Sequence, residues 1–252
     1  MESLFCFGHL KMLFISRLYS QFNLRIINLP KPINGRVKQL FVNHSLAGHE
    51  LITPPEDSFN LLKDDNISLV FQGRDKFIYK FIKPRRWHEY YKAFYGRSRT
   101  SKEVYANLRL KELGIKVPFI HEYSIAMVPT HFRGFTGYYI MEPADGIGNA
   151  RPFINELSDS SRKAFINQLL KDLEIMRKNR IIYSDLSLGN LFCGREGELC
   201  WIDTAIKEYS RFSQKKFEKN WDKTMAKFMS WEKKAKTLNE NELSQLEDVL
   251  CS

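Results

Sequence analysis

Residues 181–205, IIYSDLSLGNLFCGREGELCWIDTA, constrain the local fold more strongly than any other part of the chain. Two short apolar runs, residues 191–193 and 199–202, flank the segment GREGE, which carries two glycines and three charges. Apolar runs joined by a turn of this composition predict an antiparallel β-hairpin. The two ends of such a hairpin lie side by side, so residues just outside it are brought together.

Three polar residues border this predicted hairpin. Asn190 precedes the first run, Asp203 follows the second, and Asp185 lies five residues before Asn190. A register that pairs Leu191 with Ile202 sets Asn190 opposite Asp203, with Cα atoms roughly 4.5 to 5.5 Å apart. Mg²⁺ is bound by one or two carboxylates together with substrate phosphates, so this pair suits it. Asp and Asn are also common turn residues, and each alone has a structural explanation.

An Asp, four residues, an Asn and then a hairpin ending in Asp resemble the catalytic loop and metal-binding Asp of the protein-kinase-like fold. The resemblance implies a strand Lys that grips the nucleotide phosphates and a Glu on the next helix that holds this Lys. Lys80 lies in KFIYKFI, whose composition predicts a strand. Glu103 lies near the start of a predicted helix that has Thr100 or Ser101 as its N-cap. Taken singly, these two charges are typical of a solvated strand and of a helix N-terminus.

The same resemblance assigns a hinge. Residues 138–141 predict a short strand, and EPADG follows, with Glu142 where adenine would meet the backbone between two lobes. A helix capped by Ser158 or Asp159 is predicted next, from its apolar periodicity. The predicted fold class is therefore α+β: a two-lobed protein-kinase-like fold with a β-rich N-lobe and a reduced, mainly helical C-lobe. The predicted parts are an N-terminal extension and linker, the N-lobe and the C-lobe, at residues 1–50, 51–142 and 143–252.

Two segments narrow the resemblance further. YGRSRTSKEVYANLRLKELGIKVP and DLSLGN, in a small chain, resemble the lipopolysaccharide core kinases, the heptose and Kdo kinases, and above all the heptose kinases. This implies ATP-dependent phosphorylation of a sugar hydroxyl of the inner core, at the cytoplasmic face of the inner membrane, with ATP and Mg²⁺ as cofactors. Asp185 would accept the hydroxyl proton, and Asn190 and Asp203 would hold the metal. Lys80, Glu103 and Glu142 would bind the nucleotide.

The chain also departs from the kinase pattern. Tyr183 and Ser184 replace the usual His and Arg, which removes the partner of a phosphorylated activation loop. No G-x-G-x-x-G precedes the strand Lys: a single Gly73 falls at a predicted turn, so backbone donors around residues 63–66 are expected to cover the phosphates. Lys207 is a candidate for the cation that stabilises the transferred phosphoryl group.

The tail disfavours a protein acceptor. Only residues 204–252 follow the second Asp, and they predict one or two amphipathic helices rather than a peptide-docking platform. Phe217, Trp221, Met225 and Phe228 or Met229 recur at helical spacing. A stripe of this kind is more often core than a membrane-surface or partner helix, and we expect it to be core.

A basic segment indicates anionic partners. The chain carries a net charge of +10, and residues 83–102 interleave seven Lys and Arg residues with the aromatic residues Trp87, Tyr90, Tyr91, Phe94 and Tyr95. Such a segment attracts polyanions, although many charge runs are only solvated faces. Its place between the Lys80 strand and the Glu103 helix favours an anionic glycolipid or sugar substrate, or a peripheral contact with the inner membrane, over nucleic acid.

Other features predict a cytoplasmic enzyme. No apolar run approaches the roughly 20 residues of a membrane span, and residues 1–30 lack the pattern of a signal peptide. The four cysteines form no C-x-x-C pair, so neither zinc nor a disulfide framework is expected. The alternatives to a sugar kinase are a Ser/Thr protein kinase-like enzyme, an inactive nucleotide-binding regulator and a nucleic-acid-binding module.

Overall fold

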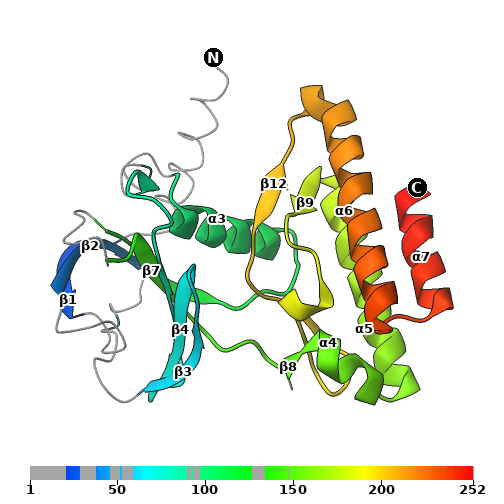
Figure 1. Ribbon diagram of the computed structural model, residues 1–252, viewed down its shortest axis with the longest axis horizontal. Helices are drawn as coiled ribbons and strands as arrows, with labels where there is room; N and C mark the ends of the chain where they lie inside the picture. Colours follow the sequence, from blue (N-terminus) through cyan, green and yellow to red (C-terminus); the bar gives the residue numbers. More distant parts are fainter. Residues whose placement is uncertain are drawn as a thin grey trace. The chain divides into compact units, whose positions relative to one another are not determined.

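The fold divides into two units. The structure is a computed structural model and describes residues 21–28, 38–45, 52, 59–89, 92, 97–126, 134–146 and 148–251 (Figure 1). One unit comprises residues 1–105 and 119–143, and the other comprises residues 106–118 and 144–252. Each unit has a hydrophobic cluster of its own.

The first unit is built on an antiparallel sheet. Its strands are β1 (Gln21–Asn28), β2 (Lys38–Ser45), β3 (Phe59–Asp64), β4 (Ser68–Gly73), β5 (Ile78–Ile82), β6 (Ile120–Ala126) and β7 (Gly137–Met141). They are ordered β1-β2-β6-β7-β5-β4-β3, and every neighbouring pair is antiparallel. The predicted turn at Gly73 is confirmed, because the Gly73 amide donates to the Phe77 carbonyl at 3.0 Å between β4 and β5.

Alternation along β5 gives the strand two distinct faces. Tyr79 and Phe81 are fully buried and stack on Phe71 of β4, with ring centroids 5.1 and 5.8 Å away. Successive side chains of a strand point to opposite faces, so Lys80 between them points to the other face. Lys80 is nevertheless buried, at 7% exposure, which explains why KFIYKFI shows no polar alternation.

Residues 1–50, predicted as an N-terminal extension and linker, contain two of the strands of this sheet. β1 pairs with β2, and β2 pairs with β6, from Phe41 opposite Ala126 to Ser45 opposite Glu122. The predicted linker at residues 30–35 lies outside the described residues. The predicted division into three parts stays a prediction.

Helix α3 (Arg99–Glu112) begins earlier than expected. The Ser98 hydroxyl accepts the Ser101 amide at 2.9 Å, so Ser98 is the N-cap and the prediction of Thr100 or Ser101 was wrong. The sequence offers a run of hydroxyl residues here, and composition alone does not choose among them. Gly114, with φ +78°, follows the end of the helix, and the Ile115 amide donates to the Leu110 carbonyl at 3.0 Å.

The second unit is mainly helical. Its helices are α4 (Ala150–Phe153), α5 (Asp159–Lys178), α6 (Gln214–Ala235) and α7 (Glu240–Cys251), with 3₁₀ turns η1 (Ile154–Glu156), η2 (Leu188–Asn190) and η3 (Arg211–Ser213). Its strands are β8 (Gly148–Asn149), β9 (Ile181–Tyr183), β10 (Leu191–Cys193), β11 (Leu199–Trp201) and β12 (Ile206–Glu208). They form the small sheets β11-β10-β8 and β12-β9. Ser158, one of the two predicted caps of α5, accepts the Ser161 amide at 3.2 Å.

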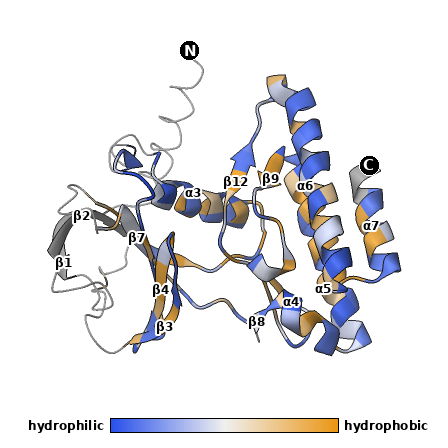
Figure 2. Ribbon diagram, in the orientation of Figure 1, coloured by the Kyte–Doolittle hydropathy of each residue, from blue (hydrophilic) through white to orange (hydrophobic). Residues whose placement is uncertain are grey.

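The aromatic stripe of α6 belongs to the core, as predicted. Phe217, Trp221, Met225 and Phe228 are buried in one cluster with α5 and the small strands, while the remaining faces of α6 are largely hydrophilic (Figure 2). α7 packs against α5 and α6. In the described parts of the chain, no helix has both the length and the apolar character needed to cross a bilayer.

Candidate active site

A buried ion pair joins β5 to α3 within the first unit. Lys80 Nζ lies 2.9 Å from Glu103 Oε2, and the two side chains are 8% and 5% exposed. The Tyr139 hydroxyl, from β7, donates to the same Glu103 oxygen at 3.0 Å, and Arg99 Nε donates to the other oxygen at 3.0 Å. A buried charge is tolerated only when its hydrogen-bonding groups are satisfied, and both carboxylate oxygens of Glu103 have partners.

The loop that contains Asp185 is closed by its own residues. Asn190 Nδ2 donates to the Asp185 carbonyl at 2.7 Å, and the Asn190 amide donates to the Ser187 carbonyl at 3.0 Å. The Asp185 side chain is exposed at the surface of the second unit. Because the amide nitrogen of Asn190 is engaged within the loop, its Oδ1 is the atom left for a cation.

The hairpin forms as predicted, but its register differs by one residue. Leu191 pairs with Trp201, and the Ile202 amide donates to the Asn190 carbonyl at 3.1 Å. The predicted pairing of Leu191 with Ile202 was therefore wrong, and Asp203 lies one residue beyond the position opposite Asn190. Asp203 has φ +56°, in the left-handed region, so the chain turns there instead of continuing the strand.

The loop between β10 and β11 explains the shift. Gly197 has φ +89°, and the Gly194 amide donates to the Glu198 carbonyl at 2.8 Å. A glycine in this conformation permits a three-residue hairpin loop. The predicted register would need a longer loop. It was derived by pairing the first apolar residue of one run with the last apolar residue of the other, without regard to the turn that the glycine makes.

Tyr183, which stands where the kinase pattern has His, ties two segments together. Its hydroxyl donates to the Ile202 carbonyl, and its ring lies 4.9 Å from the Trp201 ring. The next residue, Ser184, donates its amide to the Ala205 carbonyl at 2.7 Å. Ile202 and Ala205, before and after Asp203, thus accept hydrogen bonds from the two residues that precede Asp185.

The carboxylate of Asp203 and the amide oxygen of Asn190 fit a hard divalent cation. Both are oxygen ligands, and they flank the paired ends of β10 and β11. No group of three or more His, Cys, Asp and Glu side chains able to hold a metal occurs among the described residues. A cation here would therefore take its other ligands from water and substrate phosphates, as Mg²⁺ commonly does.

Sequence reasoning missed Glu232 of α6, which is fully buried. Its Oε1 accepts the Leu188 amide at 3.1 Å and Arg151 Nη2 at 2.6 Å, and its Oε2 accepts the Thr237 hydroxyl at 2.7 Å. Leu188 lies between Asp185 and Asn190, so Glu232 anchors their loop. The available signal was an acidic residue in register with the apolar stripe of α6, four positions after Phe228.

Glu142 lies where β7 ends. Its amide donates to the Phe119 carbonyl at 2.9 Å, and its carboxylate, about half exposed, lies 3.3 Å from His121 Nε2. The Glu142 amide is therefore engaged. The carbonyl is the backbone group through which Glu142 could meet a nucleotide base.

The turn at residues 65–67, between β3 and β4, is stabilised by Asp65. Asp65 Oδ1 accepts the Ile67 and Ser68 amides at 2.8 and 2.7 Å, and Lys63 Nζ lies 3.0 Å from Oδ2. Partial burial opposes ionisation, yet the bonds from Lys63 and the two amides hold the pKa of Asp65 well below its usual range. The Asp65 amide itself donates to the Ser68 carbonyl at 3.0 Å, so it is not the open phosphate donor expected at residues 63–66.

Some of the charges of the basic segment form ion pairs within the protein. Lys83 pairs with Asp64, and Arg99 pairs with Glu103, which leaves fewer of its charges for a partner. Trp87 is 67% exposed. The other aromatic residues of the segment, Tyr90, Tyr91, Phe94 and Tyr95, lie outside the described residues.

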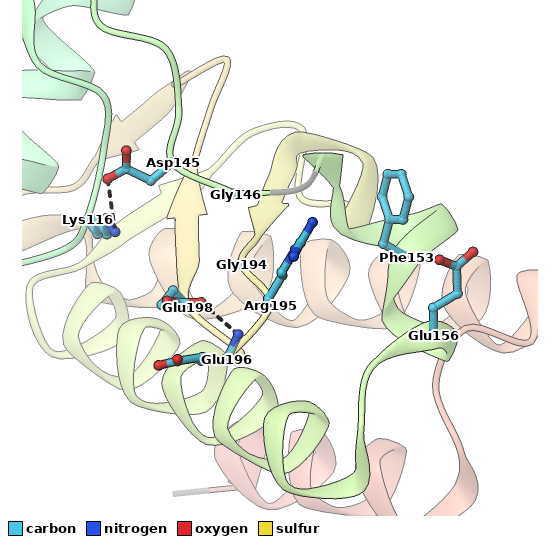
Figure 3. Close-up of a pocket in the computed structure, with 9 residues that line it drawn as sticks. All are labelled: Lys116, Asp145, Gly146, Phe153, Glu156, Gly194, Arg195, Glu196 and Glu198. Carbon is cyan, nitrogen blue, oxygen red and sulfur yellow. Dashed lines mark hydrogen bonds and ion pairs between the residues drawn. The ribbon is translucent and has the colours of Figure 1, made fainter.

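A hollow of about 920 Å³ in the second unit contains none of the predicted site residues. Figure 3 shows Lys116 paired with Asp145 on one side, Phe153 and Glu156 on the other, and Arg195, Glu196 and Glu198 of the β10–β11 loop between them. Its lining mixes both signs of charge and includes four acidic side chains. The chemistry of the candidate site does not depend on it.

The two units define the class of fold: a β-rich unit with a buried Lys–Glu pair and a mainly helical unit with an Asp–Asn loop are protein-kinase-like. The predicted fold class is confirmed by a solved structure, WaaP in complex with acyl carrier protein. The match has a TM-score of 0.51 at 10% identity and covers 76% of this chain and 78% of that chain. At this identity the likeness shows the fold. No family model and no curated protein matches the chain.

Proposed function

We propose that this protein is an ATP-dependent kinase that phosphorylates a sugar hydroxyl, a heptose of the lipopolysaccharide inner core. The observation that supports it most is the buried pair of Lys80 and Glu103 at 2.9 Å, in a fold like that of WaaP. A buried Lys on a strand, held by a Glu on the next helix, is the arrangement that grips nucleotide phosphates in kinases.

The remaining residues have complementary roles in this proposal. Asp185, exposed beside a loop held closed by Asn190, orients the acceptor hydroxyl and accepts its proton as the oxygen attacks the γ-phosphate. Asn190 and Asp203 would hold Mg²⁺, which would neutralise charge on the phosphates. Phosphoryl transfer asks the protein chiefly for positioning and charge stabilisation, which these groups supply.

The acceptor class rests on two supports. The segments at residues 95–118 and 185–190 resemble those of the lipopolysaccharide heptose kinases, and the fold of this chain is similar to that of WaaP. The net charge of +10 and the basic segment at residues 83–102 favour an acceptor rich in phosphate and carboxylate, reached from the cytoplasm at the inner membrane. WaaP was solved with acyl carrier protein, so a contact with such a protein is proposed for this chain as well.

Transfer of labelled phosphate from ATP tests the proposal. With Mg²⁺, we expect label in complete core lipopolysaccharide and none in heptose-deficient core. Asp185→Asn should lower kcat by about 10²- to 10⁴-fold, because general-base catalysis is worth that much. Asp222→Asn, at an exposed Asp of α6, is the matched control and should leave kcat unchanged.

The same assay separates the alternatives. Undiminished transfer by Asp185→Asn would remove the assigned role. Label in protein acceptors alone would indicate a protein kinase. An ATP-dependent rise in melting temperature without any ATP consumption would indicate an inactive nucleotide-binding regulator.

A further inference from the structure

A second, smaller hollow of the second unit adjoins the Asp185 loop. Its volume is about 190 Å³, below the roughly 300–1,000 Å³ of pockets that enclose drug-sized ligands. We call it the basic pocket. Its lining residues are Ile182, Ser184, Leu186, Lys207, Tyr209, Asn220, Lys223, Thr224 and Lys227.

Three separate elements build the basic pocket. Asn220, Lys223, Thr224 and Lys227 follow the spacing i, i+3, i+4 and i+7, so they share one face of α6. This face adjoins the buried stripe of the helix but is distinct from it. Lys207 comes from β12, and Ile182 comes from β9.

The chain segment around Asp185 closes the basic pocket. Ser184 and Leu186, the two neighbours of Asp185, both line it. A ligand seated in the pocket therefore contacts the chain segment that carries the proposed general base, whose own side chain is not part of the lining.

The lysines of the basic pocket lack acidic partners. Within the described residues, no carboxylate forms an ion pair with Lys207, Lys223 or Lys227. Lys227 Nζ instead lies 4.2 Å from the centroid of the Trp231 ring, on the surface of the molecule. The residues that line this small hollow include three lysines and no Asp or Glu, which favours an anion.

The polar groups of the basic pocket suit the same ligand. Asn220 Nδ2 donates to the Tyr209 hydroxyl oxygen at 3.1 Å, so the hydroxyl hydrogen of Tyr209 remains to be donated. Phosphate and carboxylate oxygens accept such hydrogen bonds and form the strongest ones with charged donors.

We propose that the basic pocket binds a phosphate or carboxylate that the acceptor carries close to the hydroxyl presented to Asp185. The proposal deepens the proposed function, on which it rests. It makes the enzyme selective for acceptors that already bear an anionic group. The γ-phosphate of ATP is the other source of the same chemistry, and the experiment distinguishes the two.

The test is the double variant Lys223→Gln/Lys227→Gln, assayed with anionic core oligosaccharide. We expect the KM for the acceptor to rise about 10- to 100-fold, because one hydrogen bond to a charged group is worth about that factor. The KM for ATP should not change. The matched control is Lys215→Gln/Lys219→Gln, which removes the same charge from exposed positions of α6 that do not line the pocket.

A second experiment removes the anionic group from the acceptor, so that the change in the protein and the change in the acceptor can be combined. Acceptor stripped of its phosphate or carboxylate should bind wild-type protein as poorly as intact acceptor binds the double variant, with no further loss when both changes are combined. A rise in the KM for ATP alone would assign the pocket to the nucleotide and overturn the proposal. Equal losses in the double variant and the control would reduce it to an effect of net charge, which also overturns it.

A binding measurement keeps the proposal separate from the kinase assignment. If wild-type protein transfers no phosphate to any core acceptor, the proposed function fails. Calorimetric titration with the same anionic oligosaccharide still decides on the basic pocket: weaker binding by the double variant alone supports it, and equal binding by all three proteins overturns it.

Discussion

At the scale of single residues, Glu103 is the most constrained group of the candidate site. One of its oxygens receives Lys80 and the Tyr139 hydroxyl, and the other receives Arg99, one helical turn earlier. These four side chains come from β5, β7 and α3 of one unit. The ion pair is therefore held by the sheet and the helix of that unit alone.

Substitution of this pair tests its proposed role. Lys80→Met should lower kcat/KM for ATP by at least about 100-fold, because a charge-assisted contact with the phosphates is lost. Arg99→Met should change it less than about 5-fold, since the Arg99 side chain is 35% exposed and such pairs contribute about 0–1 kcal/mol. Steady-state kinetics with varied ATP measure both. Wild-type kinetics in Lys80→Met would contradict the assignment.

A second prediction at this scale concerns Asp172 of α5, which is buried. Its carboxylate accepts hydrogen bonds from Trp201 Nε1 and Gln168 Nε2, each at 2.7 Å. Burial raises the pKa of Asp172 above its ordinary value, against the opposing effect of these two bonds. The folded state then binds a proton more tightly than the unfolded state. The contribution of Asp172 to the free energy of unfolding falls as pH rises from about 3.9, the ordinary value, through the raised pKa.

Asp172→Asn removes this titration. Compared with wild-type protein, the variant should gain relative stability as pH rises through that window and show a constant difference above it. Denaturant unfolding at a series of pH values measures the difference. Asp159→Asn, at the exposed start of the same helix, is the control, and a pH-independent difference for Asp172→Asn would contradict the expected shift.

At the scale of elements, the loop that contains Asp185 depends on a helix distant in sequence. Glu232 of α6 accepts the Leu188 amide and pairs with Arg151 of α4, so α6 holds both η2 and α4. Leu186 and Leu188 of this loop are buried in the core of the second unit, and Glu232 adds a hydrogen bond to that packing. The position of the loop therefore depends both on apolar packing and on a buried carboxylate, both of whose oxygens accept hydrogen bonds.

Truncation at this position should affect stability and turnover together. Glu232→Ala leaves the Leu188 amide and the Arg151 guanidinium without their acceptor and should cost about 3–5 kcal/mol of unfolding free energy. Glu232→Gln keeps an oxygen acceptor and should cost less, with kcat reduced and the affinity for ATP unchanged. Denaturant unfolding and kinetics measure these effects. Retention of full kcat in both variants would show that the loop does not need this anchor.

The same elements show how far the sequence predicts the structure. Local signals were sufficient for the hairpin, α5 and the stripe of α6, because period and turn residues act over a few positions. The register was wrong because one left-handed glycine, Gly197, shortens the loop. Glu232 was missed because its partners, Leu188 and Arg151, are 44 and 81 residues away, and no local pattern encodes them. The pairing of β2 with β6 is non-local in the same way.

At the scale of the whole molecule, two separate hydrophobic clusters support the two units. The first is rich in stacked aromatic rings of the sheet, and the second gathers α5, α6 and α7 around the small strands. The candidate residues are divided between them: Lys80 and Glu103 belong to one unit, and Asp185, Asn190 and Asp203 belong to the other.

Separate cores predict separate responses to a cavity. Phe228→Ala removes a fully buried ring from the second cluster and should cost about 3–5 kcal/mol there. Native-state hydrogen exchange read by mass spectrometry should show lost protection in α5 and α6 and unchanged protection in β4 and β5. Phe71→Ala should give the reverse pattern. Equal loss in both units from either variant would mean that they unfold as one.

The contact between Lys227 and the indole of Trp231 gives α6 an intrinsic fluorescent reporter. Lys227 rests on this partly exposed ring, and a charge held 4.2 Å from an indole influences its emission. An anion that draws the ammonium group into the basic pocket moves the charge away from the ring. Binding of an anion in that pocket should therefore change the wavelength and intensity of tryptophan fluorescence in the unlabelled protein.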